Sequence, residues 1–184
     1  KKTPSKKKQY IPKPYEKMQY PGQRVQIDVK FVPSTYLLVE NRETGEAYYQ
    51  YTAIDEYTRI RYTWFTNEHS TYMSSEFVKR LVRYYPFKIK TIQTDNGFEF
   101  TNRLNANQTN TKTLFENTLE ELGIRHKLIK PKTPRHNGKV ERSHRKDQER
   151  FYYNKVFCSF EDFKNRLRYW EKEYNDFPMK PLGW

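Results

Sequence analysis

The spacing of apolar residues changes along this chain in an order that few folds can accommodate. Residues 23–32 alternate, with Val25, Ile27, Val29 and Phe31 on one face, which is typical of a β-strand. Two more strand-like segments follow before any helical spacing begins. The predicted elements are strands at 23–32, 48–54 and 60–65, a helix from 70 to before 86, a strand at 89–94, a helix at 114–122, a strand at 124–129, and helices at 139–153 and from 160 onward.

This order of elements predicts an α/β domain. Three consecutive strands followed by strand–helix–strand crossovers give a five-stranded mixed sheet flanked by helices. The helix that begins at Ser70 implies a right-handed crossover to a parallel strand. The 184 residues suffice for one domain and a tail. We therefore expect a core at 21–184 and a separate segment at 1–20.

The segment at 1–20 is rich in lysine and proline and has no periodicity. Proline interrupts helices and the lysines repel one another, so we expect an extended basic arm. The arm could lie on phosphates or tether a neighbouring domain, and both readings stay open. The chain has 35 Lys and Arg against 22 Asp and Glu, a net charge of +13 that favours a polyanionic partner.

Other features of the sequence limit the setting in which this protein works. No apolar run approaches the roughly 18 residues of a membrane span, and no signal peptide is visible. The single cysteine, Cys158, excludes a disulfide framework and a cysteine-based zinc site within one chain. We expect a reducing, cytoplasmic setting without a membrane. Because the chain begins with Lys1, we also expect it to be a piece of a longer protein.

Two aspartates stand where strand propensity does not favour them. Asp28 lies in the middle of the first strand, opposite its apolar face. Asp95 directly follows the buried strand at 89–94 and precedes an Asn-Gly turn, which would hold its carboxylate rigidly at the rim of a sheet. Each could be a metal ligand. The alternatives are a solvated strand face for Asp28 and an Asx turn for Asp95.

A third acidic residue, Glu141, opens a helix at 139–153 that is too polar for packing alone to explain. Glu141, Arg145 and Gln148 share one face of that helix. The alternative reading is a solvated helix with ion pairs on its surface. Asp55 is a rival to the other aspartates, but its place at the start of a hairpin loop at 55–59 favours turn chemistry.

Three segments of the sequence, at 26–29, 94–100 and 133–142, resemble the three acidic motifs of DDE transposases and retroviral integrases. The resemblance covers roughly residues 20 to 184 and is strongest to the integrase-type core of bacterial insertion-sequence transposases. It implies a ribonuclease-H-like fold and a catalytic triad of Asp28, Asp95 and Glu141. The spacing between Asp95 and Glu141 is longer than the family usually has. An Asn- and Thr-rich insertion at 102–113 can absorb the surplus at small entropic cost.

Three converging carboxylates repel one another unless cations neutralise them. Oxygen ligands suit Mg²⁺ or Mn²⁺, and two ions at Asp28, Asp95 and Glu141 could support an in-line phosphoryl displacement. The resemblance then implies cleavage at transposon ends and transfer of the freed 3′-hydroxyl into target DNA. The alternatives are a DNA-binding or assembly module that has lost catalysis, and a nuclease of the same fold without strand transfer.

The expected partners are DNA and further copies of the chain assembled on it, in the nucleoid of a prokaryotic cell. Six basic residues near the predicted site offer phosphate contacts, which position DNA without reading its sequence. The four histidines lack a zinc spacing, so His136 and His144 are expected to contact DNA or solvent. Gly138 should let the loop before Glu141 move. The six basic residues are Lys132, Arg135, Lys139, Arg142, Arg145 and Lys146.

Overall fold

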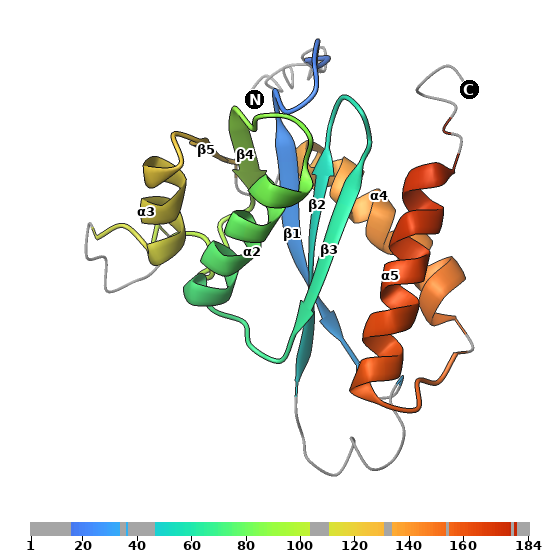
Figure 1. Cartoon of the computed structure of the whole chain (residues 1–184). Coiled ribbons are helices and arrows are strands. Elements are labelled where there is room, and N and C mark those ends of the chain that lie inside the picture. Colours follow the sequence, from blue (N-terminus) through green and yellow to red (C-terminus); the bar gives the residue numbers. More distant parts are fainter. Residues whose placement is uncertain are drawn as a thin grey trace, which may run out of the picture.

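A five-stranded sheet forms the centre of the domain (Figure 1). The computed structural model describes residues 16–33, 36, 47–103, 111–130, 134–153, 155–177 and 179. Its strands are β1 (Val25–Val32), β2 (Tyr48–Asp55), β3 (Arg61–Thr66), β4 (Thr91–Thr94) and β5 (Arg125–Leu128). Its helices are α2 (Thr71–Tyr84), α3 (Leu114–Glu121), α4 (Gly138–Lys146) and α5 (Phe160–Asp176), with a 3-10 turn η2 (Pro134–Asn137) before α4 and a π-helical segment η3 (Asp147–Tyr152) after it.

The strands lie in the order β3-β2-β1-β4-β5, so β1 is central. β2 is antiparallel to both β1 and β3, while β4 is parallel to both β1 and β5. Across β1 and β4, Val25 pairs with Ile92 and Gln26 with Gln93. The predicted five-stranded mixed sheet and the predicted order of strands and helices are confirmed.

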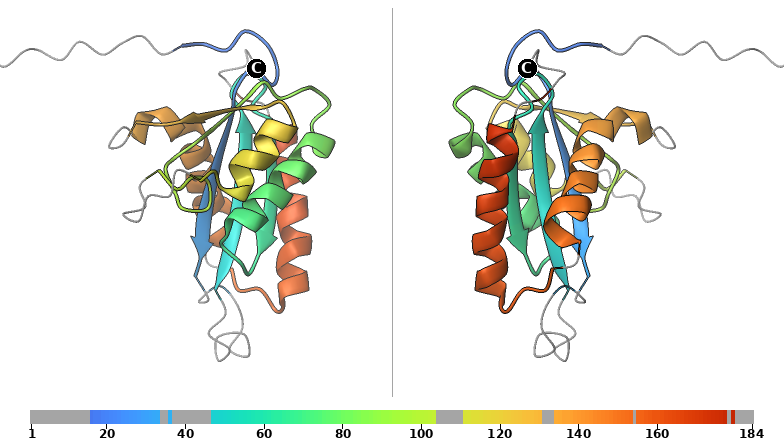
Figure 2. Two further views of the ribbon diagram at one scale, coloured as in Figure 1. Left: turned by 90° about the vertical axis from the view of Figure 1, so that its left-hand side faces the viewer. Right: turned by 90° about the vertical axis from the view of Figure 1, so that its right-hand side faces the viewer.

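Two apolar clusters attach the helices to opposite faces of the sheet (Figure 2). Burial of apolar side chains drives both contacts. On one face, α2 and α3 pack on the sheet through residues that include Ile27, Tyr51, Phe77, Ile92 and Phe115. On the other face, α4, η3 and α5 pack through residues that include Val32, Tyr48, Val140, Phe151, Phe163 and Trp170.

The central strand presents an apolar face to one side and a mainly polar face to the other. Val25 and Ile27 are buried against α2 and α3. Gln26, Asp28 and Lys30 point the opposite way, because side chains alternate along a strand. Each of these three contacts the segment formed by α4 and η3. The polar character of α4 therefore matches the strand face that it covers.

The expectation that packing would not explain so polar a helix was wrong. Val140, Ser143 and Asp147 of this segment are buried. Asp147 accepts hydrogen bonds from Nη1 of Arg61 at 2.5 Å and from Nε1 of Trp170 at 2.6 Å. Arg61 and Asp147 are both fully buried. A buried ion pair thus stands where an apolar contact would normally attach a helix.

The predicted helix ends are confirmed in α2 and α3. The Ser70 hydroxyl accepts a hydrogen bond from Met73 N at 3.2 Å and caps α2. Gly123 follows α3 with a φ of +66°, a conformation that glycine adopts without a steric penalty. Within the described ranges, no helix combines the length and hydropathy needed to cross a membrane.

The ends of the predicted insertion at 102–113 are bonded to each other, while residues 104–110 lie outside the described residues. The Thr113 hydroxyl donates to Phe100 O at 2.9 Å, and Asn102 Nδ2 donates to Thr111 O at 3.1 Å. Thr113 also forms a capping box with Glu116 at the start of α3. The extra residues are therefore closed off at their base.

The predicted arm falls mostly on residues 1–15, which lie outside the described residues. Its last five residues have no helix or strand, but they contact the domain. Met18 is buried, and the Glu16 carboxylate is bonded to Nη1 of Arg24 at 2.8 Å.

Side chains of α5 occupy the outer edge of β3. Thr63 N donates to Oε1 of Glu171 at 2.8 Å. Asn175 receives a hydrogen bond from Arg61 N at 2.8 Å and donates one to Arg61 O at 2.8 Å. Burial between helix and strand raises the pKa of Glu171 to about 7.

We expect the variant E171Q to gain stability relative to the unaltered protein as the pH rises. In the unfolded chain this carboxyl ionises near its ordinary pKa of 4.5, but in the folded protein it keeps its proton until about 7. The folded state binds more protons in that window, so its stability falls as the pH increases. Urea unfolding at pH 4 and pH 8 should show the stability advantage of E171Q growing by roughly 3 kcal/mol. The variant E173Q, at an exposed neighbouring position, should show no such trend. If the free energy of unfolding changed equally between pH 4 and pH 8 in all three proteins, the prediction would be contradicted.

Candidate active site

Asp28 lies on the polar face of the central strand, where it pairs in register with Thr52 of β2. Its carboxylate is partly exposed, and Oδ2 lies 3.3 Å from Nδ1 of His144 on α4. The backbone at Asp28 is paired with β2, and β1 is also paired with β4 two residues earlier, at Val25 and Gln26, so the strand that carries this carboxylate is well anchored.

Asp95 directly follows β4 and is held by the turn that ends the strand. Its Oδ1 accepts a hydrogen bond from Gly97 N at 2.9 Å, so the Asx turn considered above is present. Asn96 Nδ2 donates to Ile129 O at 3.0 Å and joins the turn to the end of β5. A Cβ atom on Gly97 would lie 2.3 Å from the Glu99 carboxylate, so the close approach favours glycine here. The turn fixes Asp95 at the sheet rim.

A histidine that the sequence analysis did not single out supports this turn. Nε2 of His69 lies 3.0 Å from Oε1 of the buried Glu99. The His69 ring also stacks on Tyr49 and packs on Phe98, with centroid distances of 4.8 and 4.6 Å. These contacts join the turn to β2, a connection between residues too distant in sequence for a local pattern to indicate.

Glu141 lies in the first turn of α4, with an exposed side chain. Its pKa is raised first by partial burial of the carboxyl and then by the charge of Asp28, and Asp95 adds to the rise. The pKa of Asp95 is raised by burial, against the Gly97 hydrogen bond that lowers it, and the charges of Asp28 and Glu99 raise it further. The charge of Asp28 thus contributes to the raised pKa of both other carboxyls.

The donor set fits a divalent cation of the Mg²⁺ or Mn²⁺ type. All three groups offer carboxylate oxygens, which these hard cations prefer, and positive charge would relieve the repulsion between them. Within the described part of the chain, no three His, Cys, Asp or Glu side chains are close enough to enclose one ion. Asp28, Asp95 and Glu141 therefore do not enclose an ion in this structure, and Glu141 is the most exposed of the three.

His144 corrects one expectation from the sequence. It was expected to contact DNA or solvent, but its side chain is mostly buried and lies against Asp28. His144 follows Glu141 by three residues, so both fall on one face of α4. That spacing was the feature of the sequence that could have placed His144 beside the predicted site. His136 is exposed, but its carbonyl accepts hydrogen bonds from Gln26 and Gln93.

Of the first three basic residues predicted to contact DNA, the structure describes the side chain of one, Lys139. Lys132 lies outside the described residues, as does the side chain of Arg135. The mobility predicted for the loop before Glu141 falls partly on 131–133, which also lie outside, while 134–137 form η2. The Lys139 ammonium is bonded to the buried carboxylate of Glu56, which also binds Arg24. Lys139 thus joins α4 to the domain interior.

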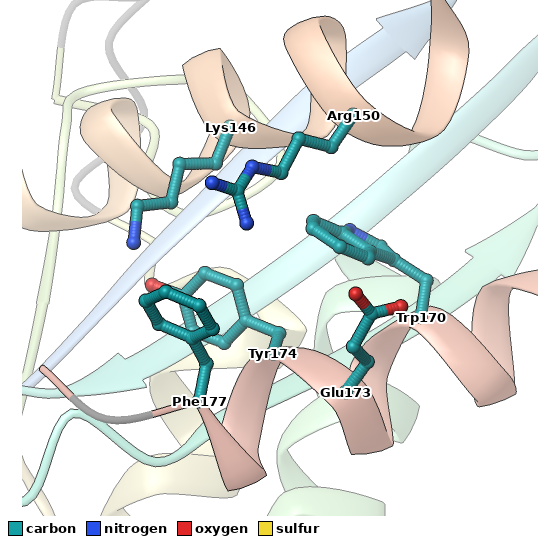
Figure 3. A pocket seen from close by; sticks show the side chains of 6 residues that line it. All are labelled: Lys146, Arg150, Trp170, Glu173, Tyr174 and Phe177. Atoms are coloured by element: carbon teal, nitrogen blue, oxygen red, sulfur yellow. The ribbon is translucent and has the colours of Figure 1, made fainter.

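The other three predicted DNA contacts lie on α4 and point in two directions. Arg142 and Arg145 are exposed. Lys146 instead faces α5, with Nζ 5.5 Å from the ring centroids of Tyr174 and Phe177, and Figure 3 shows these three side chains together. Burial lowers the pKa of Lys146. Its ammonium is therefore engaged in cation–π contacts between the two helices.

Asp55, the rival aspartate, serves the hairpin. Its Oδ2 accepts hydrogen bonds from the Thr58 amide at 2.7 Å and the Thr58 hydroxyl at 2.8 Å. Its Oδ1 accepts from Gly22 N at 3.0 Å. The expected turn chemistry is confirmed.

Comparison with known proteins gives matches along most of the chain. Two models of the integrase core domain match, one over residues 19–134 and the other over 122–178. A candidate integrase named ORF3, from Spiroplasma virus SpV1-C74, is 30% identical over 158 residues, which cover 82% of this chain and 42% of that protein.

Solved structures add a likeness in fold. A chain of the simian T-cell lymphotropic virus intasome, solved in complex with the PP2A regulatory subunit B56 gamma, matches with a TM-score of 0.59 and 15% identity. The match covers 97% of this chain and 51% of that one. The catalytic core domain of BIV integrase matches with a TM-score of 0.48 and 19% identity, over 70% of this chain and 68% of that one. This chain thus spans about half the length, or less, of the ORF3 and intasome chains.

Proposed function

Because the chain belongs to the integrase core domain family, we propose that it cuts DNA strands and joins them to other DNA. Its fold is the ribonuclease-H-like fold of integrase cores, and the family's enzymes are DDE-type polynucleotidyl transferases. The substrates proposed here are the ends of a mobile element and a target duplex. Transposon ends are the specific proposal from the sequence motifs, and the viral relative makes viral DNA ends the competing one.

One observation supports the proposal: the charge of Asp28 on β1 raises the pKa both of Asp95, which follows β4, and of Glu141 on α4. A cluster of like charges costs stability, so its presence calls for a functional reason. Structural ion pairs elsewhere in the domain, such as Arg61 with Asp147, are matched in charge. The site carboxylates have His144 as a neighbour but lack an equal number of cations among the described contacts.

Each carboxylate has its own task in this proposal. Asp28 and Asp95 would hold the cations, one from the central strand and one from a bonded turn. Glu141, exposed on α4, completes the ligand set. The chemistry that bound Mg²⁺ or Mn²⁺ ions supply is activation of the attacking oxygen and stabilisation of the leaving one. Water as the attacking group yields a nick, and a 3′-hydroxyl yields a joined strand, so no protein nucleophile is required.

DNA would be held by basic side chains around this site. The net charge of +13 favours binding to phosphates, and exposed Arg142 and Arg145 are the described residues best placed on α4 for such contacts. Assembly of several copies on DNA is part of the proposal, in keeping with the multi-chain complex that gave the intasome likeness.

The test is an assay on labelled duplexes that separates cutting from joining. We expect the unaltered protein to nick a labelled oligonucleotide in Mn²⁺ and, given a recessed 3′-end, to form longer joined products. Nicking without joined products would favour the nuclease alternative. DNA binding without either activity, in both Mg²⁺ and Mn²⁺, would favour a module that has lost catalysis and would overturn the proposal.

A further inference from the structure

Two buried glutamines bond the start of α4 to the sheet. Gln26 Oε1 accepts hydrogen bonds from Lys139 N at 3.0 Å and from Val140 N at 3.2 Å. Gln26 Nε2 donates to His136 O at 3.0 Å, and Gln93 Nε2 donates to the same carbonyl at 2.6 Å. Both glutamines are buried, so these bonds are shielded from competing water.

These bonds replace the helix's own cap. The first N–H groups of any helix have no partner within the helix. Asn137, at the N-cap position of α4, makes no side-chain capping bond. Gln26 supplies the missing acceptor from another element. The position of the first turn of α4 is therefore set directly by Gln26 of β1, and the preceding segment η2 is held by Gln26 and by Gln93 of β4 through the carbonyl of His136.

The same two strands carry the two aspartates of the site. Gln26 lies two residues before Asp28 on the same face of β1. Gln93 lies in β4, two residues before Asp95, which directly follows that strand. Gln26 and Gln93 are partners in register. The Gln-x-Asp pattern thus occurs twice and places a pair of amides beside a pair of carboxylates.

From Gln26 onward, two residues of β1 span nearly the same distance as four residues of the helix that covers it. α4 runs alongside β1, since Gln26 contacts Val140, Asp28 contacts His144 and Lys30 contacts Gln148 further on. Two residues of strand span about 6.6 Å, and four residues of helix span about 6 Å. A helix bonded to Gln26 at Val140 therefore brings its next turn opposite Asp28.

We propose that Gln26 and Gln93 are positioning residues that fix the register of α4 on the sheet, so that Glu141 faces Asp28 and Asp95. The inference rests on the proposed function for the role of Glu141, but the register itself depends only on the bonds described above. Without the two amides, the first turn of α4 would lose its sheet partners and Glu141 would lose its fixed approach to the other carboxylates.

The test uses Q26M and Q93M, which keep the side-chain length but remove the bonds. The exposed Gln19, whose side chain bonds locally, gives the control Q19M. Hydrogen exchange should speed up in residues 138–146 of Q26M while β1 and β2 stay protected. Mn²⁺ affinity and nicking should both fall by about 10–100-fold, the loss expected when a group that orients a metal ligand is removed.

Each result decides the matter. Unchanged exchange in α4, or faster exchange throughout the sheet, would overturn the proposal, because the bonds would then be dispensable or merely structural. Faster exchange in α4 with unaltered Mn²⁺ affinity and nicking would overturn the positioning role. If the unaltered protein neither binds Mn²⁺ nor nicks DNA, the proposed function fails, and the register device then stands or falls on exchange in α4.

Discussion

The variant D95N will bind DNA and fold as the unaltered protein does, but its Mg²⁺-dependent nicking will fall by about a thousandfold or more. Asparagine keeps the shape of the side chain and can still accept the 2.9 Å hydrogen bond from Gly97 N. What it lacks is the negative charge that a cation needs, and a thousandfold loss corresponds to about 4 kcal/mol of transition-state stabilisation. D28N and E141Q should behave alike, because each removes one of three ligands.

Thermal unfolding provides a second test of the same variants, because it measures stability with and without the metal. The raised pKa values of Asp95 and Glu141 mean that their charges oppose folding near neutral pH. Without metal, D95N should be at least as stable as the unaltered protein. Mg²⁺ should raise the Tm of the unaltered protein and of a control outside the site, but not that of the three site variants. The matched control is E149Q, an exposed carboxylate on η3 outside the site. Retained Mg²⁺-dependent nicking in any of the three site variants would contradict the assignment.

Removal of the buried Asp147 carboxylate will be the most damaging of these changes to stability. In D147A the Arg61 guanidinium keeps its burial but loses its counter-charge, and Trp170 Nε1 loses its acceptor. Breaking a buried pair on one side costs about 3–5 kcal/mol, which should appear as a lower urea midpoint with an unchanged slope. The exposed D176A should stay within about 0.5 kcal/mol of the unaltered protein.

The same ion pair predicts an acid-labile fold. Burial alone would raise the pKa of Asp147, but the Arg61 charge and the hydrogen bonds from Trp170 and Gln50 outweigh it and hold the pKa below its ordinary 3.8. The stabilisation is complete above that value and is lost as the pH falls through the lowered pKa. A double variant with apolar residues at both positions should recover much of the loss, since a buried pair gains little over good apolar packing. A double variant as unstable as D147A would contradict this account.

Local patterns in the sequence were sufficient to predict the helices and strands, and they drew attention to the three acidic residues of the proposed site. Alternation identified β1, and the Asn-Gly turn after a buried strand pointed to Asp95, because both signals depend on neighbouring residues. The pairing of Arg61 with Asp147 joins residues 86 positions apart, so no local pattern could predict it. The polarity of the α4 segment was visible, but its cause, the polar face of β1, required the register of the sheet. The two Gln-x-Asp repeats were equally visible and had no meaning until β1 and β4 were known to be neighbours.

The bonds from Glu171 and Asn175 to β3 prevent another strand from pairing with that edge of the sheet. A strand at the border of a sheet normally offers its backbone groups to any extended peptide, and such borders seed fibrils. Here the amides of Arg61 and Thr63 are already taken by a helix of the same molecule. An incoming peptide would have to displace α5 before it could lengthen the sheet at that side. Recruitment of an extra strand, by a partner or during aggregation, is thereby directed to the opposite border, at β5.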